Sequence, residues 1–252
     1  MKAALAVTRV TRDLESNIQG ILRQVAEAAS AGADLVLFPE AAVTGLVNND
    51  DPSHDLPLGQ AIPGPVTRRI AAEAARHSIY VALGILELDS GALYDSAVLF
   101  DPAGEIAMKY RRISRGWHGP RCDPSVYRHG ASIEQAPTPL GSTVFLICGD
   151  LFDDSLVERV RNMHADYVLC PMSRCYDTLS YDQERWKRET KWEYAERAAS
   201  LRTAVLVVNS LAEPEVGGDF GGALVIGPTG EILAELPIGQ EGLLLADLPG
   251  HA

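Results

Sequence analysis

The sequence has little positive charge, and it contains no long hydrophobic run. Lysine and arginine number 22 against 34 acidic residues, which gives a formal net charge of -12 over 252 residues. Nucleic acids and anionic membranes bind proteins through a positive footprint, which this composition does not supply. No apolar stretch approaches the roughly 18 residues needed to span a bilayer. We therefore expect neither a nucleic acid nor a membrane as a partner.

Cysteine is also scarce, and recognisable cofactor motifs are missing. The four cysteines are Cys122, Cys148, Cys170 and Cys175. So few thiols in a chain of this size favour a reducing compartment, and the first ten residues contain only a short apolar run, unlike a secretory leader. The histidines show no close pair at metal-ligand spacing, and there is no glycine-rich phosphate loop. We expect a cytoplasmic protein without a metal or cofactor.

The chain does contain enough apolar residues, 46% of the total, to build a large core. Its first half alternates β-like and helical patterns and ends in a hairpin with a Pro/Gly turn. The expected order is strand 3–8, helix 13–34, strand 35–40, helix 65–78, strand 79–88, and a hairpin of strands 94–100 and 105–110. Asp13 is a candidate cap of the first helix, and Gly32 marks its end.

The second half repeats the first. ADLVLFP at 33–39 returns as ADYVLCP at 165–171, and VLFDPAGEIAMK at 98–109 returns as LVIGPTGEILAE at 224–235. Two similar α/β half-units whose helices cover one face of each sheet can bury the remaining faces by packing sheet on sheet. The sequence therefore predicts a four-layer α-β-β-α sandwich that forms a single domain over residues 1–252.

Three stretches at strand ends are candidates for chemistry, because loops converge there in α/β proteins. Glu40 follows a buried strand, and Cys148 ends the apolar run FLIC. Taken alone, Glu40 could be a solvated loop charge and Cys148 a core side chain. Gly149 permits a tight turn after Cys148, and a helix expected just beyond would favour the thiolate. The third stretch is the cationic run 109–115, usually a solvated edge.

Together these stretches resemble the nitrilase, or carbon-nitrogen hydrolase, superfamily. The resemblance covers nearly the whole chain, in the order FPE, YRRI, ICGD, WEYAERAASLRTAVLVVN and GGALVIGPTGEILAE. It implies the same sandwich fold, assembly into homodimers or larger homo-oligomers, and hydrolysis of non-peptide amides, nitriles or carbamoyl groups by a glutamate, a lysine and a cysteine. Glu40 and Cys148 match two of these positions. The resemblance also places residues 172–177 and 210–220 at the mouth of the pocket.

The lysine position of that pattern is occupied by Arg112. Lys109 lies three residues earlier on an extended strand, so it should point to the opposite face and cannot simply replace the lysine. Arginine keeps the charge and can hold an oxyanion, but it cannot lend a proton. The loop 115–130 also lacks the second glutamate that many members of the superfamily carry.

Two function classes follow. The first is a hydrolase of a small linear amide, carbamoyl compound or nitrile, with Cys148 as nucleophile, Glu40 as general base and Arg112 as the cation that stabilises the oxyanion. A thioester intermediate is expected, and an acyltransferase could use the same residues. The second class is a catalytically silent relative that keeps the fold to bind a small molecule or a partner.

Overall fold

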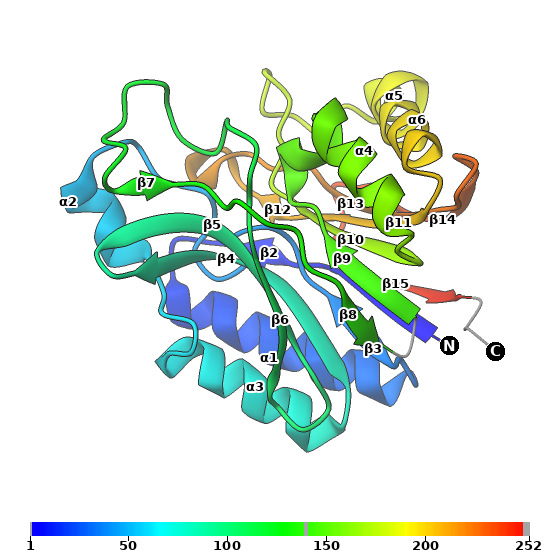
Figure 1. Cartoon of the computed structure of the whole chain (residues 1–252), viewed down its shortest axis with the longest axis horizontal. Helices are drawn as coiled ribbons and strands as arrows, with labels where there is room; N and C mark the ends of the chain where they lie inside the picture. Colours follow the sequence, from blue (N-terminus) through cyan, green and yellow to red (C-terminus); the bar gives the residue numbers. More distant parts are fainter. Residues whose placement is uncertain (1, 139–140, 249–252) are drawn as a thin grey trace.

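The chain folds into two β-sheets packed face to face, with helices on both outer faces (Figure 1). The computed structural model describes residues 2–138 and 141–248. Within them the first sheet has the strand order β15-β1-β3-β4-β5-β6, with β7 paired to β5, and the second has the order β14-β13-β11-β10-β9-β8. The predicted four-layer α-β-β-α sandwich is therefore confirmed.

The strands of the first sheet are β1 (Lys2–Val7), β3 (Leu35–Leu37), β4 (Tyr80–Asp89), β5 (Ala92–Phe100), β6 (Ile106–Arg111), β7 (Tyr127–Arg128) and β15 (Gly242–Asp247). Those of the second are β8 (Ala136–Thr138), β9 (Gly141–Phe145), β10 (Tyr167–Met172), β11 (Ala204–Asn209), β13 (Gly221–Ile226) and β14 (Ile232–Ile238). A small pair joins β2 (Arg9–Val10) to β12 (Leu211–Ala212). The series β1-β3-β4-β5-β6 thus recurs as β9-β10-β11-β13-β14, which confirms the two similar half-units.

The helices α1 (Leu14–Ser30) and α3 (Pro65–His77) cover the first sheet. The helix α4 (Asp154–Met163) and the continuous helical segment α5 (Gln183–Arg185), η3 (Trp186–Thr190) and α6 (Lys191–Leu201) cover the second. Short turns are α2 (Pro52–Asp55), η1 (Leu56–Leu58), η2 (Cys148–Phe152) and η4 (Pro214–Val216). Asp13 caps α1 as predicted, because its Oδ1 accepts a hydrogen bond from the Ser16 backbone N at 2.6 Å.

Successive side chains of β1 point alternately into two hydrophobic cores. Ala3, Leu5 and Val7 belong to the cluster that fills the space between the sheets, whereas Ala4 and Ala6 belong to the cluster under α1 and α3. Both sets are fully buried, because a central strand of a layered sandwich has an apolar partner on each face. This explains why the strand reads as a continuous apolar run instead of an alternating one.

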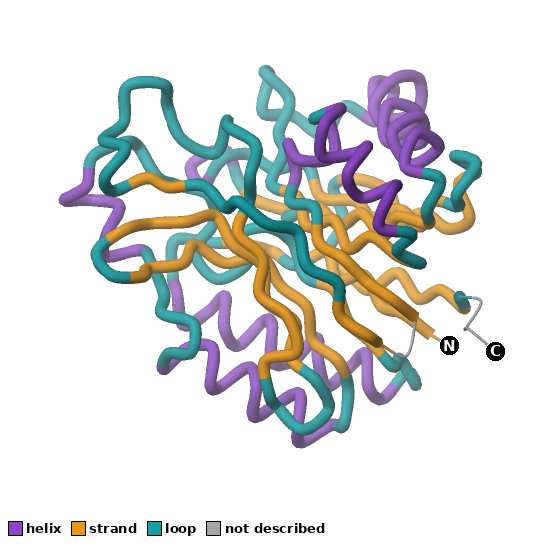
Figure 2. Tube along the Cα trace, viewed as in Figure 1, coloured by secondary structure: helices purple, strands orange, loops and turns teal. Residues whose placement is uncertain are grey.

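The C-terminal strand β15 crosses back to the first sheet and pairs antiparallel with β1, from Lys2↔Asp247 to Val7↔Gly242. Strands β3 and β4 are parallel to β1, so the carboxyl ends of all three strands lie at the edge opposite the Lys2–Asp247 pair. Figure 2 shows long loops gathered at that end of the molecule. Among the described residues, no helix combines the length and the apolarity needed to cross a membrane.

Candidate active site

Glu40 lies in the turn that follows β3, and its side chain is fully buried. The strand is shorter than expected, because pairing ends at Leu37 before Pro39 removes a backbone donor. Both carboxylate oxygens are hydrogen-bonded: Oε1 accepts from Arg112 Nη1 at 2.9 Å, and Oε2 accepts from the Ser173 backbone N at 2.7 Å. Glu40 is therefore held in place from both half-units, which a solvated loop charge would not be.

Arg112 directly follows β6 and is 4% exposed. Its guanidinium carries five N–H donors. One Nη1 nitrogen serves both Glu40 and Asp95, the latter at 3.2 Å, and Nε donates to Ser114 Oγ at 3.0 Å. Nη2 donates to the Arg115 carbonyl at 3.3 Å. Four donors thus have acceptors within the described ranges, and one N–H of Nη2 does not.

Cys148 begins the 3-10 turn η2 in a left-handed backbone conformation, with φ 43°. Non-glycine residues seldom adopt this conformation, and they do so mostly where the surroundings hold them. Asp150 supplies that hold: its carboxylate accepts from the backbone N of Ile147 at 3.0 Å, from Ser114 N at 2.7 Å and from Tyr110 OH at 2.7 Å. The turn thus projects a thiol that is 9% exposed from a rigid frame.

The structure brings the three predicted site residues together. A methyl group added at Gly149, next to Cys148, would overlap Nη2 of Arg112, the nitrogen with the spare N–H. The expected helix forms as α4, but η2 separates the thiol from its N-terminus, so Cys148 does not lie in the first turn of a long helix. The positive charge near this thiol comes from Arg112 and Arg174 instead.

Asp95 is a fourth member of the site that the sequence reasoning missed. It is buried on β5, its Oδ2 contacts Arg112 Nη1, and its Oδ1 has no hydrogen-bond partner in the described part of the chain. The signal was available in the hairpin register. Strands β5 and β6 pair Ser96 with Arg111, and the next pair places Asp95 against Arg112, whose backbone N donates to the Asp95 carbonyl at 2.8 Å.

One guanidinium therefore faces two buried carboxyl groups. Burial raises the pKa of Glu40 well above its usual range, charge on Cys148 and Asp95 raises it further, and Arg112 opposes this shift. Burial likewise raises the pKa of Asp95 in spite of Arg112. Burial alone would lower the pKa of Arg112, but the two carboxylates outweigh it and raise the pKa. The arrangement keeps the arginine charged and lets the carboxyl pair retain a proton.

Lys109 points away from this site, as the strand geometry predicted. Its Nζ lies 2.8 Å from Glu87 Oε1, and Arg111 on the same face of β6 makes a two-pronged contact with the same carboxylate, both bonds at 2.8 Å. Tyr110 and Arg112 occupy the other face. Lys109 therefore cannot take the place of Arg112.

The two segments expected at the mouth of the pocket are joined by hydrogen bonds. Ser173 Oγ donates to Asp219 at 2.7 Å, and Ser210 Oγ donates to the same carboxylate. Asn209 Oδ1 accepts from the backbone N of Arg174 at 2.8 Å, and its Nδ2 donates to the Arg174 carbonyl at 2.9 Å. This network fixes the backbone N of Ser173 that binds Glu40.

The loop 115–130 contains a chain of contacts in place of a second glutamate. Cys122 Sγ lies 3.1 Å from His118 Nδ1, and His118 Nε2 lies 3.0 Å from His129 Nε2. Burial and two nearby aspartates raise the pKa of Cys122. Residues 2–138 and 141–248 contain no group of three or more His, Cys, Asp or Glu side chains placed to hold a metal ion.

The chain is similar to known proteins over almost its whole length. The family model for carbon-nitrogen hydrolases matches residues 2–251. An aliphatic nitrilase of Sinorhizobium fredii is 24% identical over 98% of this chain and 85% of its own length, and nitrilase 3 of Arabidopsis thaliana is 27% identical over 95% of this chain and 75% of its own length.

Solved structures show the same fold. An amidase from Nesterenkonia sp. AN1 superposes with a TM-score of 0.81 at 24% identity, over 99% of this chain and 93% of that one. A carbon-nitrogen hydrolase from Helicobacter pylori G27 superposes with a TM-score of 0.85 at 18% identity, over 99% and 89%. The family match over nearly every residue, together with the shared fold, shows that this chain belongs to the carbon-nitrogen hydrolase family, in the nitrilase superfamily.

Proposed function

We propose that this protein hydrolyses the C–N bond of a small non-peptide amide, carbamoyl compound or nitrile through a thioester on Cys148. The observation that carries the proposal is the convergence of Glu40, Arg112 and the strained Cys148 turn in one buried site. Such a convergence of a nucleophile, a base and a cation is more than core packing requires, and strained backbone is commonly found at functional sites.

For an amide, the thiol of Cys148 gives its proton to Glu40, and the sulfur attacks the carbonyl carbon. The carbonyl oxygen becomes an oxyanion, which the spare N–H of Arg112 Nη2 stabilises. The C–N bond then breaks, and the nitrogen leaves as ammonia after Glu40 returns the proton. Glu40 next takes a proton from water, whose oxygen attacks the thioester, and the carboxylic acid leaves as the thiol is restored.

The direction of the Glu40 pKa shift supports this role, because a carboxyl group that both takes and gives a proton needs a pKa above its usual acidic range. Arg112 itself stays protonated throughout, so it contributes its charge and an N–H donor but transfers no proton. Asp95 is a positioning residue: it contacts Nη1 of Arg112 and so orients the guanidinium whose other nitrogen faces the thiol turn.

One observation favours the silent alternative. Both oxygens of Glu40 already accept a hydrogen bond, from Arg112 and from Ser173, so the carboxylate is held by contacts that need no turnover. A protein that only binds a small molecule would gain rigidity from the same contacts.

The experiment that separates the two readings is a screen of small linear amides, nitriles and carbamoyl compounds for ammonia release, with the unaltered chain beside Cys148→Ala. Turnover that Cys148→Ala abolishes, together with an acyl adduct on Cys148 in intact-protein mass spectrometry, supports the hydrolase. Binding of these compounds with neither ammonia nor adduct supports the silent relative. Hydroxylamine added to the screen detects acyl transfer.

A further inference from the structure

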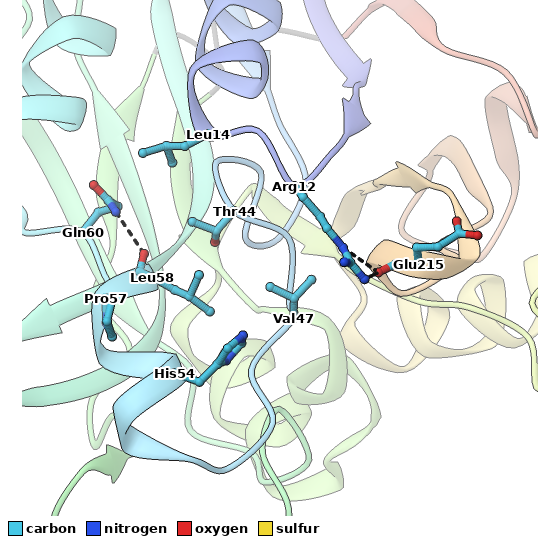
Figure 3. A pocket seen from close by; sticks show the side chains of 9 residues that line it. All are labelled: Arg12, Leu14, Thr44, Val47, His54, Pro57, Leu58, Gln60 and Glu215. Atoms are coloured by element: carbon cyan, nitrogen blue, oxygen red, sulfur yellow. Dashed lines mark hydrogen bonds between the residues drawn. The ribbon is translucent and has the colours of Figure 1, made fainter.

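A second pocket, separate from the site of Cys148, opens between the N-terminus of α1, the turn after Glu40 and the short elements α2 and η1. Its volume is about 480 Å³, which lies within the roughly 300–1,000 Å³ of small-molecule sites. Its apolar wall is formed by Leu14, Val47, Pro57 and Leu58 (Figure 3).

Thr44 points to a ligand in this pocket. Its side chain lines the pocket and is 8% exposed, yet its Oγ1 has no hydrogen-bond partner in the described part of the chain. An unpaired buried hydroxyl is energetically costly, so such groups usually have a partner when their site is filled. The hydroxyl hydrogen rotates about the Cβ–Oγ1 bond, so it can point to a ligand oxygen placed beside it.

One arginine, Arg12, and one histidine, His54, border the pocket of a strongly acidic protein. Arg12 is anchored through Nε and Nη2, which donate to the Glu215 carbonyl at 3.2 Å and 2.7 Å, and this leaves Nη1 for another partner. His54 contacts Asp55 through Nδ1 at 2.6 Å, which leaves Nε2. In Figure 3, Gln60 and the Arg12 guanidinium lie on opposite sides of Thr44. The carboxylate of Glu215 points away from the pocket.

We propose that this pocket binds a small organic carboxylate with an apolar body and a second oxygen acceptor along its chain. The carboxylate pairs with Arg12, the apolar body fills the space along Leu14, Val47 and Leu58, and the second oxygen accepts from Thr44 Oγ1. The pocket is separate from the site of Cys148, because none of these residues hydrogen-bonds to Glu40, Arg112 or Cys148.

The wall of this pocket belongs to the turn that carries Glu40. The backbone N of Thr44 and of Gly45 both donate to the Ala41 carbonyl, at 3.1 Å and 2.7 Å, and Ala41 adopts φ 45°. A ligand held by Thr44 therefore rests against the same compact turn that positions Glu40.

The test is isothermal titration with three non-hydrolysable probes that differ by one feature each. 4-Benzoylbutyrate has the carboxylate, the apolar ring and the ketone; 5-phenylpentanoate lacks the ketone; butyrophenone lacks the carboxylate. We expect 4-benzoylbutyrate to bind saturably and 5-phenylpentanoate about 3- to 10-fold more weakly, since one hydrogen bond is worth about 0.5–1.5 kcal/mol. Butyrophenone should bind at least about tenfold more weakly than 4-benzoylbutyrate.

Variants assign the binding to this pocket. Thr44→Val should weaken 4-benzoylbutyrate but not 5-phenylpentanoate, and Arg12→Gln should weaken both acids but not butyrophenone. Arg76→Gln, an exposed arginine on α3, is the matched control and should change none. Circular dichroism of each variant checks the fold, and Leu58→Trp, which fills the pocket, should abolish binding if Thr44→Val does not fold.

Three results would each overturn the proposal: no saturable binding of 4-benzoylbutyrate at 10 mM, affinities of the acids unchanged in Arg12→Gln, or a ketone preference that persists in Thr44→Val. Because the readout is heat of binding, a failure here is distinct from a failure of the proposed hydrolase activity.

Discussion

Two buried glutamates bind cations from opposite faces of the same strand, and they differ in the balance of charge around them. Glu87 faces Lys109 and Arg111 and also accepts from Ser96 Oγ at 2.7 Å. Glu40 has one cation, Arg112, which it shares with Asp95.

The pKa shifts of the two glutamates have opposite signs. Burial acts to raise the pKa of Glu87, but hydrogen bonds from Arg111, Lys109 and Ser96 outweigh it, so the pKa is lowered. At Glu40 burial dominates and the pKa is raised. Where carboxyl groups outnumber cations, as around Glu40, a carboxyl group can bind and release a proton. Where cations outnumber carboxylates, as around Glu87, the carboxylate stays ionised. The comparison therefore assigns reactivity to the Glu40 cluster and stability to the Glu87 cluster.

The largest expected effect is on catalysis at Glu40. Glu40→Gln keeps the shape of the side chain but removes the proton acceptor, so kcat/KM for the substrate found in the screen should fall by about 10³-fold or more. Glu87→Gln is the matched control and should change kcat/KM per folded molecule by less than about twofold. Equal losses in both variants would show that the two clusters do not differ in function.

Arg112→Lys should reduce kcat/KM by about 10²-fold, the scale of losing one oxyanion donor. The Arg112 guanidinium donates four hydrogen bonds within the protein and has a fifth N–H for the oxyanion. A lysine ammonium group has only three N–H donors, so it cannot make the same contacts and also bind the oxyanion. Steady-state kinetics of the variant measures the loss, with Lys109→Arg as the control that should stay near the unaltered rate. A gain in activity would mean that Arg112 is an impaired substitute for lysine.

Glu87→Gln should lower the free energy of unfolding by about 2 kcal/mol. Removing one partner of a buried ion pair typically costs about 3–5 kcal/mol, and the cost is smaller here because Lys109 and Arg111 are 35% and 23% exposed and can be rehydrated. Urea unfolding followed by circular dichroism gives the value. A change below 0.5 kcal/mol would contradict the stabilising role of this cluster.

The smallest effect is on how stability varies with pH. Because the folded pKa of Glu87 is lowered, its contribution is complete above the unfolded value near 4.5 and is lost as the pH falls through the folded pKa. The difference in the free energy of unfolding between the unaltered chain and Glu87→Gln should therefore become smaller below about pH 4.5.

At Glu40 the folded pKa is raised, so its contribution is complete below the unfolded value near 4.5 and declines as the pH rises toward the folded pKa. Urea unfolding of both variants from pH 3.5 to 8 measures the two slopes. Slopes of the same sign would refute the contrast in charge balance.

Much of the fold follows from the sequence, because its apolar patterns and its internal repeat are local signals. The helix start at Asp13, the hairpin and the two half-units are confirmed. The strand carrying Glu40 was predicted too long, since a pattern of apolar letters does not show where the partner strand stops pairing. The single domain, the homo-oligomer and the cytoplasmic location remain predictions.

The site could be predicted only where its residues lie at strand ends. The stretches that carry Glu40, Arg112 and Cys148 were singled out at strand ends, and the resemblance to the nitrilase superfamily selected these three residues. Lys109 was excluded by strand geometry. Asp95 lies within an apolar strand and reaches Arg112 only through the register of the hairpin. Every residue except proline has a backbone N–H, so the sequence does not indicate that the one of Ser173 binds Glu40. This hydrogen bond depends on how the two half-units pack together.

The central claim is that Cys148 is a reactive thiol within the Glu40 and Arg112 site. The most direct test is the rate of alkylation of each cysteine by iodoacetamide from pH 5 to 9, read by peptide mass spectrometry in the unaltered chain and in Glu40→Gln. Burial raises the pKa of the other three thiols, Cys122, Cys170 and Cys175, which therefore serve as internal controls. We predict that Cys148 reacts fastest at neutral pH and that Glu40→Gln slows it. A Cys148 that reacts no faster than the exposed Cys175 would contradict the account.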